Sequence, residues 1–286
     1  MFNSRIAKME WNNSVFNIPE SNRLYNSVPP LMIGFDTETT GLKNNPEPIS
    51  YGFGIYRNGK LHRTEHFLAQ PLKENAIRNG TGGGVSRPSE PGAVDTHGWS
   101  DNAIRLSANG DMKPLDDNYP ANEMVHPEEF SKMKMADVSK RYYPPATHPR
   151  VAINRAVSLL AHYMKQGAVL VGANPTYDLN SFFNTYKKYN NADISTSGLN
   201  LGYYKYGDHK ILRVKAPVID VISHDIALDP HEVLKGEPGY RSRSLTNLAK
   251  HYGVDPGGHK ALDDACATVE VFKKQVDAVR RKAGIQ

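Results

Sequence analysis

The sequence predicts an α/β fold, in which a mixed β-sheet is flanked by helices. Strand-like apolar runs follow one another soon after residue 30, and beyond residue 150 such runs alternate with segments whose apolar residues recur at helical three- and four-residue steps. With 286 residues, 39% of them hydrophobic, the chain is long enough to bury a sizeable core in one or two domains.

Three strands are expected first. Residues 31–35 form an apolar run, and residues 49–56 and 60–67 flank an Asn-Gly pair. Because Asn-Gly between two strand-like runs is a preferred turn of tight hairpins, we expect the second and third strands to pair with each other. Beyond residue 150, helices are expected around residues 151–163, 179–186, 245–252 and 262–279, and strands at 168–172 and 216–219.

The domain organisation is inferred from where this periodicity fails. Residues 1–30 show no sustained period and are interpreted as an N-terminal arm. Residues 72–150 are interrupted by many Gly and Pro residues and are interpreted as a long surface insertion. We therefore expect the main domain over residues 31–281, interrupted by that insertion, with residues 282–286 as a C-terminal tail.

The composition restricts the location of the protein and the kind of metal site. No run of about 18 apolar residues occurs, and no apolar stretch follows the first residues, so we expect no membrane span, no secretory signal and a cytoplasmic location. The single Cys266 excludes an internal disulfide and a multi-thiolate zinc site, which leaves oxygen or imidazole ligands. A formal charge of +5 permits binding to phosphate backbones without requiring it.

The first chemical signal is a pair of acids at the end of the first strand. Because strand side chains alternate, Asp36 and Glu38 point to the same face, roughly 7 Å apart along the strand, and can share one hard cation. The alternative is a polar strand end that turns into a loop at Gly41. Taken alone, this pair does not choose between the two interpretations.

Two more acidic segments follow along the chain. Asp178 falls in the first turn of a helix that follows a buried strand, where it can also simply interact with the helix dipole. The last helix begins with Asp263 and Asp264 in its first turn, and His259 precedes them in a glycine-containing loop. An imidazole beside a metal-binding carboxylate can act as a general base towards water, although a solvent-facing His before a capped helix is the simpler alternative.

Together these segments resemble the DEDDh group of 3′ to 5′ exonucleases, the DnaQ-like family that includes the proofreading epsilon subunit of bacterial DNA polymerase III. The first family motif is matched by Asp36, Glu38, Thr40 and Gly41, with one extra residue before Thr40. The second is matched by Asn174, Tyr177 and Asp178, with Ala173 where the family often has His. The third is matched by His259, Ala261, Asp264 and Ala265.

The resemblance implies a ribonuclease H-like mixed sheet and a 3′ to 5′ exonuclease that releases nucleoside 5′-monophosphates. DNA, with single-stranded or frayed 3′ ends, is the preferred substrate, in proofreading or repair and with a DNA polymerase as a candidate partner. A 3′ exoribonuclease on the same fold is the first alternative, because only contacts to the 2′-hydroxyl separate the two substrates. A noncatalytic nucleic-acid-binding module is the second, although all four acids and His259 are present.

Four converging carboxylates without a thiolate cluster favour hard divalent ions, so we expect two Mg²⁺ or Mn²⁺ ions. The family pattern assigns Asp36 as the bridging ligand and His259 as the general base. It assigns the remaining ligands to Glu38, Asp178 and Asp264. Contacts to the terminal nucleotide are expected from Thr37, Thr39, Gly41, Leu42 and Asn174.

Basic and aromatic residues outside the motifs are weaker candidates for contacts to nucleic acid. Lys187 and Lys188, or Arg241 and Arg243, can reach phosphates, but such charges more often solvate a helix. The Tyr203 to Tyr206 run interleaves aromatic and basic residues and suits base stacking, although a packed loop is the favoured interpretation.

Overall fold

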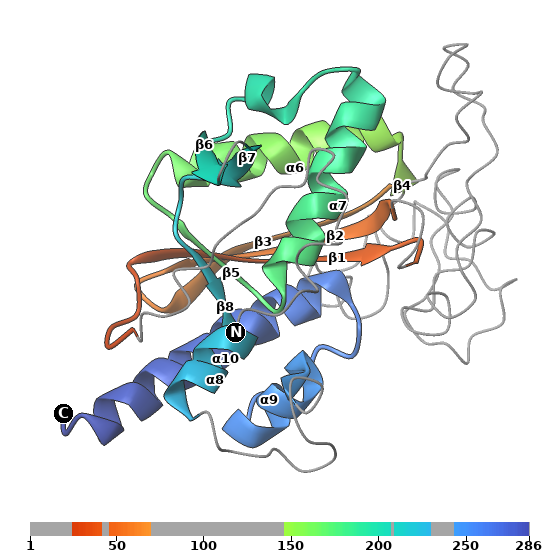
Figure 1. The fold of residues 1–286 in the computed structure, drawn as a ribbon. Helices are drawn as coiled ribbons and strands as arrows, with labels where there is room; N and C mark the ends of the chain where they lie inside the picture. The colour runs from red at the N-terminus through yellow and green to blue at the C-terminus, as the bar shows by residue number, and fades with distance from the viewer. Residues whose placement is uncertain (1–24, 42–45, 70–145, 207–208, 230–242, 286) are drawn as a thin grey trace, which may run out of the picture.

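The computed structural model describes residues 25–41, 46–69, 146–206, 209–229 and 243–285. It contains a six-stranded mixed sheet in the order β4-β3-β2-β1-β5-β8 (Figure 1). The strands of this sheet are β1 (Leu31–Thr39), β2 (Pro48–Arg57), β3 (Lys60–Ala69), β4 (Ala146–Thr147), β5 (Val169–Gly172) and β8 (Val218–Asp220). The first three are antiparallel neighbours, whereas β5 runs parallel to both β1 and β8.

Helices cover both faces of the sheet (Figure 1). One layer is formed by α6 (Pro149–Met164) and α7 (Pro175–Asn190), and the other by α8 (Val221–Leu228), α9 (Leu245–Tyr252) and α10 (Ala261–Lys282). A short 3₁₀ helix, η2 (Ile194–Ser197), and a separate hairpin of β6 (Leu201–Tyr206) and β7 (His209–Val214) lie between α7 and β8 in sequence. No helix in the described part of the chain is long and apolar enough to cross a membrane.

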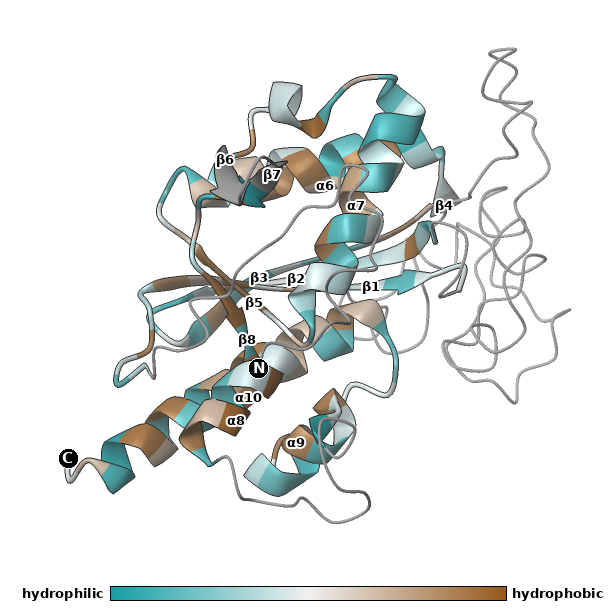
Figure 2. Cartoon of the chain, viewed as in Figure 1, coloured by the Kyte–Doolittle hydropathy of each residue, from teal (hydrophilic) through white to brown (hydrophobic). Residues whose placement is uncertain are grey.

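Alternation along β1 divides the hydrophobic core in two. Leu31, Ile33 and Phe35 belong to the core beneath α6 and α7, whereas Met32 belongs to the core beneath α8 to α10. Figure 2 shows hydrophobic residues along β5, between the two helical layers. Both faces of the central strands are therefore buried, as their nearly continuous apolar sequence requires.

The expected hairpin of the second and third strands is confirmed, with Arg57 opposite Lys60 beside its turn. Helices α6, α7, α9 and α10 and strands β5 and β8 also lie where the periodicity placed them, within a few residues. The Tyr203 to Tyr206 run, interpreted as a packed loop, instead belongs to β6, because residues 209–214 supply a second strand that pairs with it. Strand β4 and helix α8 were not predicted.

The proposed domain limits are only partly covered by the structure. Residues 1–24 of the expected arm and 70–145 of the expected insertion lie outside the described residues. Regular structure resumes at Ala146, slightly before the expected end of the insertion, and α10 continues through Lys282, the first residue of the expected tail. Of the arm, Tyr25 packs its ring edge-on against Phe272 of α10, with ring centroids 5.6 Å apart.

Candidate active site

The start of α10 lies directly against β1 and β2 because glycines face it. A Cβ on Gly34 would lie 2.1 Å from the Ala265 carbonyl oxygen, and one on Gly52 would lie 2.1 Å from the carbonyl group of Ala261. Since Gly52 is also the cross-strand partner of Asp36, this close approach brings the first turn of α10 beside the acidic end of β1. A larger side chain at either glycine would force the helix away.

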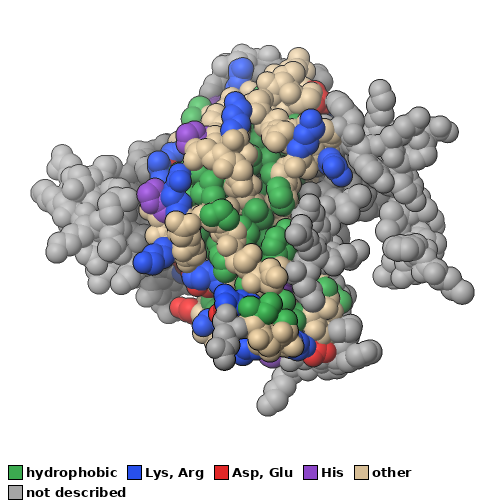
Figure 3. Space-filling model, turned by 90° about the vertical axis from the view of Figure 1, so that its left-hand side faces the viewer, with side chains coloured by type: hydrophobic (Ala, Val, Ile, Leu, Met, Phe, Trp, Pro, Cys, Tyr) green, Lys and Arg blue, Asp and Glu red, His purple; other side chains and the backbone are tan. Residues whose placement is uncertain are grey.

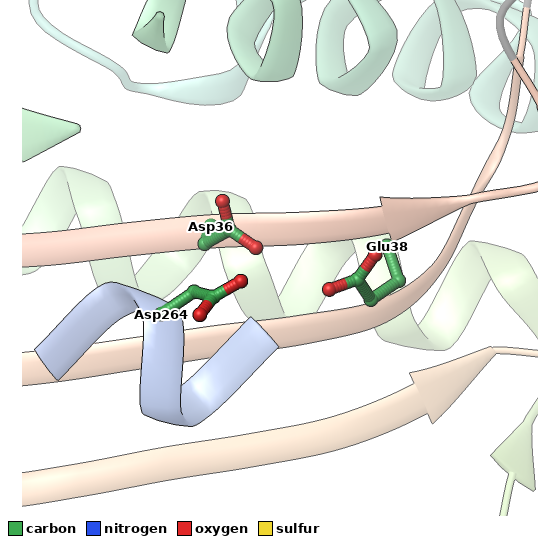
Figure 4. A group of neighbouring side chains, drawn as sticks. All are labelled: Asp36, Glu38 and Asp264. Carbon is green, nitrogen blue, oxygen red and sulfur yellow. The ribbon is translucent and has the colours of Figure 1, made fainter. Parts of the chain in front are cut away.

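Three carboxylates converge where α10 meets β1. Asp36 and Glu38 extend from the same face of β1, and Asp264 extends towards them from the first turn of α10 (Figure 4). One carboxylate oxygen of each residue lies within 4.8 Å of those of the other two. This spacing suits a shared divalent cation.

The fourth predicted acid, Asp178, is held by the opposite side of β1. Thr37 lies between Asp36 and Glu38, so its side chain points to the opposite face of β1. Its backbone N–H and its hydroxyl both donate to Asp178 Oδ1, at 3.1 and 2.6 Å. Asp178 is only 4% exposed, and its charge raises the pKa values of both Asp36 and Glu38. The four acids therefore form one electrostatic group, and the structure shows Thr37 orienting Asp178.

Burial and mutual repulsion make all four acids hard to ionise. Burial, followed by the charges of its acidic neighbours, raises the pKa of Asp36 well above its ordinary value. The same causes raise the pKa of Glu38 to about 8. Burial raises the pKa of Asp178 to about 7 against the opposing hydrogen bonds from Thr37, and it raises that of Asp264 to about 7 with help from Asp263.

No lysine or arginine forms an ion pair with these four acids in the part of the chain that the structure describes. Among the described residues, the cluster therefore has no ion-paired lysine or arginine that would offset the repulsion. Bound divalent cations would hold four ionised carboxylates together at neutral pH, and an all-oxygen donor set suits Mg²⁺ or Mn²⁺.

His259 is exposed in the loop between α9 and α10. Its φ of 59° is unusual for a residue other than glycine, and its backbone N–H donates to Asp264, which limits the rise of that pKa. Gly257 makes this turn compact, because a Cβ there would lie 2.2 Å from Asp264 Oδ1. The loop thus places an exposed His259 five residues before Asp264, with its backbone N–H bonded to that acid.

Two of the residues predicted to contact the terminal nucleotide, Thr39 and Gly41, lie where β1 ends and the following loop begins. The Thr39 hydroxyl and the Tyr177 hydroxyl both donate to the Gly41 carbonyl oxygen, at 2.9 and 2.8 Å. Gly41 has a φ of 148°, at the edge of the region that favours glycine. Leu42 lies outside the described residues.

Asn174, the remaining predicted contact, is exposed at the N-cap of α7 with a left-handed φ of 57°. Its backbone N–H donates to Asp220 Oδ1 at 3.0 Å. Asp220 also caps α8, because its Oδ1 accepts from the backbone N–H of Ile222 at 3.1 Å. Sequence analysis missed its second role, that of holding the Asn174 turn.

Two of the four basic residues considered as phosphate contacts are engaged elsewhere, whereas Lys187 is exposed. Arg243 is 4% exposed and bonds Asp225, which is incompatible with a surface contact to phosphate, and Lys188 pairs with Glu47. Arg241 lies outside the described residues. Figure 3, which views the hairpin end of the sheet, shows Lys and Arg side chains scattered around a hydrophobic band. The basic side chains on this face therefore do not form one continuous positively charged surface.

Solved structures of exonuclease I are similar to this chain. A crystal structure of E. coli exonuclease I in complex with a dT13 oligonucleotide matches with a TM-score of 0.54 and 15% identity, over 90% of this chain and 43% of that one. A product-bound exonuclease I structure gives 0.55 and 15% identity, over 89% and 45%. An ExoI/SSB-Ct complex gives 0.51 and 14% identity, over 90% and 42%.

These matches confirm the predicted fold class. The chain has the ribonuclease H-like exonuclease fold, and it spans less than half the length of the exonuclease I chains. Neither a protein-family model nor a curated protein sequence matches it.

Proposed function

We propose that this protein is a metal-dependent 3′ to 5′ exonuclease that removes nucleoside 5′-monophosphates from single-stranded DNA. The observation that carries the proposal is the group of four acids with raised pKa values and no paired cation among the described residues. The similarity of the fold to exonuclease I in complex with a dT13 oligonucleotide supports a single-stranded DNA substrate over a primer held by a polymerase.

The donor set fits two Mg²⁺ or Mn²⁺ ions. Asp36 is the proposed bridging ligand, with Glu38, Asp178 and Asp264 as the other ligands. Such ions would offset the negative charge of the phosphate and make water easier to deprotonate. They would also relieve the repulsion that keeps the carboxylate pKa values high.

The chain's own residues have distinct tasks in this proposal. His259, the exposed first residue of the third motif, accepts the proton of the attacking water. Thr37 orients Asp178 by two hydrogen bonds. Asn174 and the Gly41 end of the loop contact the terminal nucleotide.

The test uses 5′-labelled single-stranded DNA and RNA of one sequence, incubated in parallel with Mg²⁺ or with EDTA. The expected result is a ladder of DNA products that shorten from the 3′ end in Mg²⁺ alone, together with release of 5′-monophosphates. Faster shortening of RNA would make the protein an exoribonuclease. Binding without any shortening would make it a noncatalytic module and would contradict the proposal.

The matched control is Asp36→Ala. It should remove all but a trace of the activity, because loss of charge stabilisation by two ions costs several kcal/mol of barrier. Circular dichroism should show an unchanged fold, since the substitution also removes a repelling charge. Activity that survives in this variant would have to come from a contaminant or from another site.

A further inference from the structure

Glu47, immediately before β2, is a buried acid that the proposed chemistry does not use. Its side chain is 3% exposed. One carboxylate oxygen pairs with Lys188 Nζ at 2.5 Å, and the other accepts the Tyr189 hydroxyl at 2.5 Å. Both partners belong to the last part of α7, so Glu47 ties the start of β2 to this helix.

The backbone of Glu47 closes the loop that connects β1 to β2. The Thr40 N–H donates to the Glu47 carbonyl oxygen at 2.9 Å, and the Glu47 N–H donates to Thr40 Oγ1 at 3.1 Å. Thr40 is only two residues beyond Glu38. Glu47 is thereby bonded to Thr40, the residue that precedes Gly41.

The same helix holds both ends of this loop through further bonds. Tyr177 donates to the Gly41 carbonyl oxygen at 2.8 Å, and Ser181 donates to the Pro46 carbonyl oxygen at 3.0 Å. Tyr177, Ser181 and Lys188 recur at steps of four and seven residues, so they lie along one side of α7. That helix also carries Asp178.

We propose that Glu47 is a positioning residue that fixes the Gly41 end of the β1–β2 loop against α7 for binding of the substrate's 3′ end. The proposal rests on the proposed function for its substrate. The hydrogen bonds of Glu47 described here involve Thr40, Lys188 and Tyr189 and none of the four acids, so its proposed role is in substrate binding and not in metal binding or in the chemical step. Its loss weakens substrate binding while the turnover of bound substrate is preserved.

The principal test is Glu47→Gln, which keeps the side-chain shape but removes the charge that pairs with Lys188. We expect KM for a single-stranded oligonucleotide to rise about tenfold, with kcat within twofold of wild type. The Mn²⁺ affinity measured by calorimetry should be unchanged. Tyr189→Phe, which removes only one hydrogen bond, should raise KM less.

Asp225→Asn is the matched control, because Asp225 has the same kinds of partner. Its carboxylate accepts from Arg243 Nε at 2.8 Å and from the Tyr252 hydroxyl at 2.6 Å, and none of these residues belongs to the proposed active site. Both variants should lower the melting temperature, but only Glu47→Gln should raise KM. An equal rise in KM in both would show that general loss of stability is the cause, and would overturn the proposal.

A measurement without substrate separates this proposal from the proposed function. Amide hydrogen exchange of Thr40, followed by NMR, should be at least tenfold faster in Glu47→Gln than in wild type, and unchanged in Asp225→Asn. If the wild-type protein shortened no nucleic acid, the proposed function would fail. The role of Glu47 in fixing the loop would then be tested by the Thr40 exchange rate alone. Unchanged exchange together with unchanged KM would refute the role of Glu47.

Discussion

Two regions of this molecule bury carboxylates in opposite ways. In α8, Asp225 is 1% exposed, pairs with Arg243 and accepts a hydrogen bond from Tyr252 at the end of α9. At the end of β1, Asp36, Glu38, Asp178 and Asp264 lie together, and their pKa values are raised. Burial is common to both regions, and the difference is the presence of a cation supplied by the chain.

This difference separates a buried acid that stabilises the fold from the four acids to which we assign the proposed chemistry. The carboxylate of Asp225 is satisfied by the protein, so removing it takes away the negative charge that pairs with the buried Arg243. The carboxylates of the candidate site repel one another, so removing one relieves repulsion in the metal-free protein. Substitutions in the two regions should therefore have opposite consequences for stability and activity.

The largest effect is expected from Asp264→Asn. Loss of a metal ligand should lower kcat by about a thousandfold or more, equivalent to roughly 4 kcal/mol of barrier. The neighbouring Asp263→Asn is the matched control, because Asp263 is exposed on the same turn of α10 and should leave kcat within a few-fold. Similar losses in both variants would mean that the charge of this helix turn matters, and not the position of Asp264.

Asp225→Asn should lower the free energy of unfolding by about 3 kcal/mol, because it leaves the buried guanidinium of Arg243 without its carboxylate. Urea denaturation measures this change. The exonuclease rate at a temperature well below the transition should be preserved. A variant of unchanged stability and reduced activity would contradict the assignment of Asp225 to stability alone.

His259→Ala should reduce kcat by about a hundredfold through loss of the general base. Calorimetric titration with Mn²⁺ should be unaltered, because the substitution removes no carboxylate. Single-turnover rates give the companion test, since a rate that climbs with pH in wild type should lose this ascending limb in the variant. If both proteins show the same pH profile, another group accepts the proton.

A further expected effect is the pH dependence of stability in the metal-free protein. Because the folded state raises the four pKa values, to about 8 for Glu38, folded chains hold more protons than unfolded chains between pH about 4 and about 8. The free energy of unfolding in EDTA should therefore fall as pH rises through this window.

Differential scanning calorimetry in EDTA at several pH values measures this trend. Saturating Mg²⁺ should reverse most of the loss, and Asp36→Asn should flatten the metal-free profile because it removes one repelling charge. A melting temperature that rises from pH 5.5 to 8 in EDTA would show that the four acids are not a repelling group in solution.

The sequence by itself determined the fold class and the order of the main elements. Side-chain alternation and helical periodicity are local properties, so they were sufficient to place β1, the hairpin of β2 and β3, and helices such as α10. The same alternation puts Asp36 and Glu38 on one face of β1. The acids, His259 and the order of the three motifs could all be identified from residues close together in the chain.

Only the tertiary structure decided which distant residues meet. Helix α8 is short and depends on Asp220 as its cap, and residues 201–206 become a strand only through pairing with 209–214, so neither had a strong local signal. The pairing of Arg243 with Asp225 spans 18 residues, and that of Lys188 with Glu47 spans 141. Such contacts depend on how helices pack on the sheet, and residue spacing along the chain does not encode that packing.

The approach of Asp264 to β1 is the clearest case. It depends on Gly34 and Gly52, where the absence of a Cβ lets the backbone of α10 lie against the strands. In the sequence these glycines only weaken a strand, because their use becomes visible when a helix occupies the vacant space. Local sequence therefore determined which acids are available, and close packing of α10 on the sheet decided that they converge.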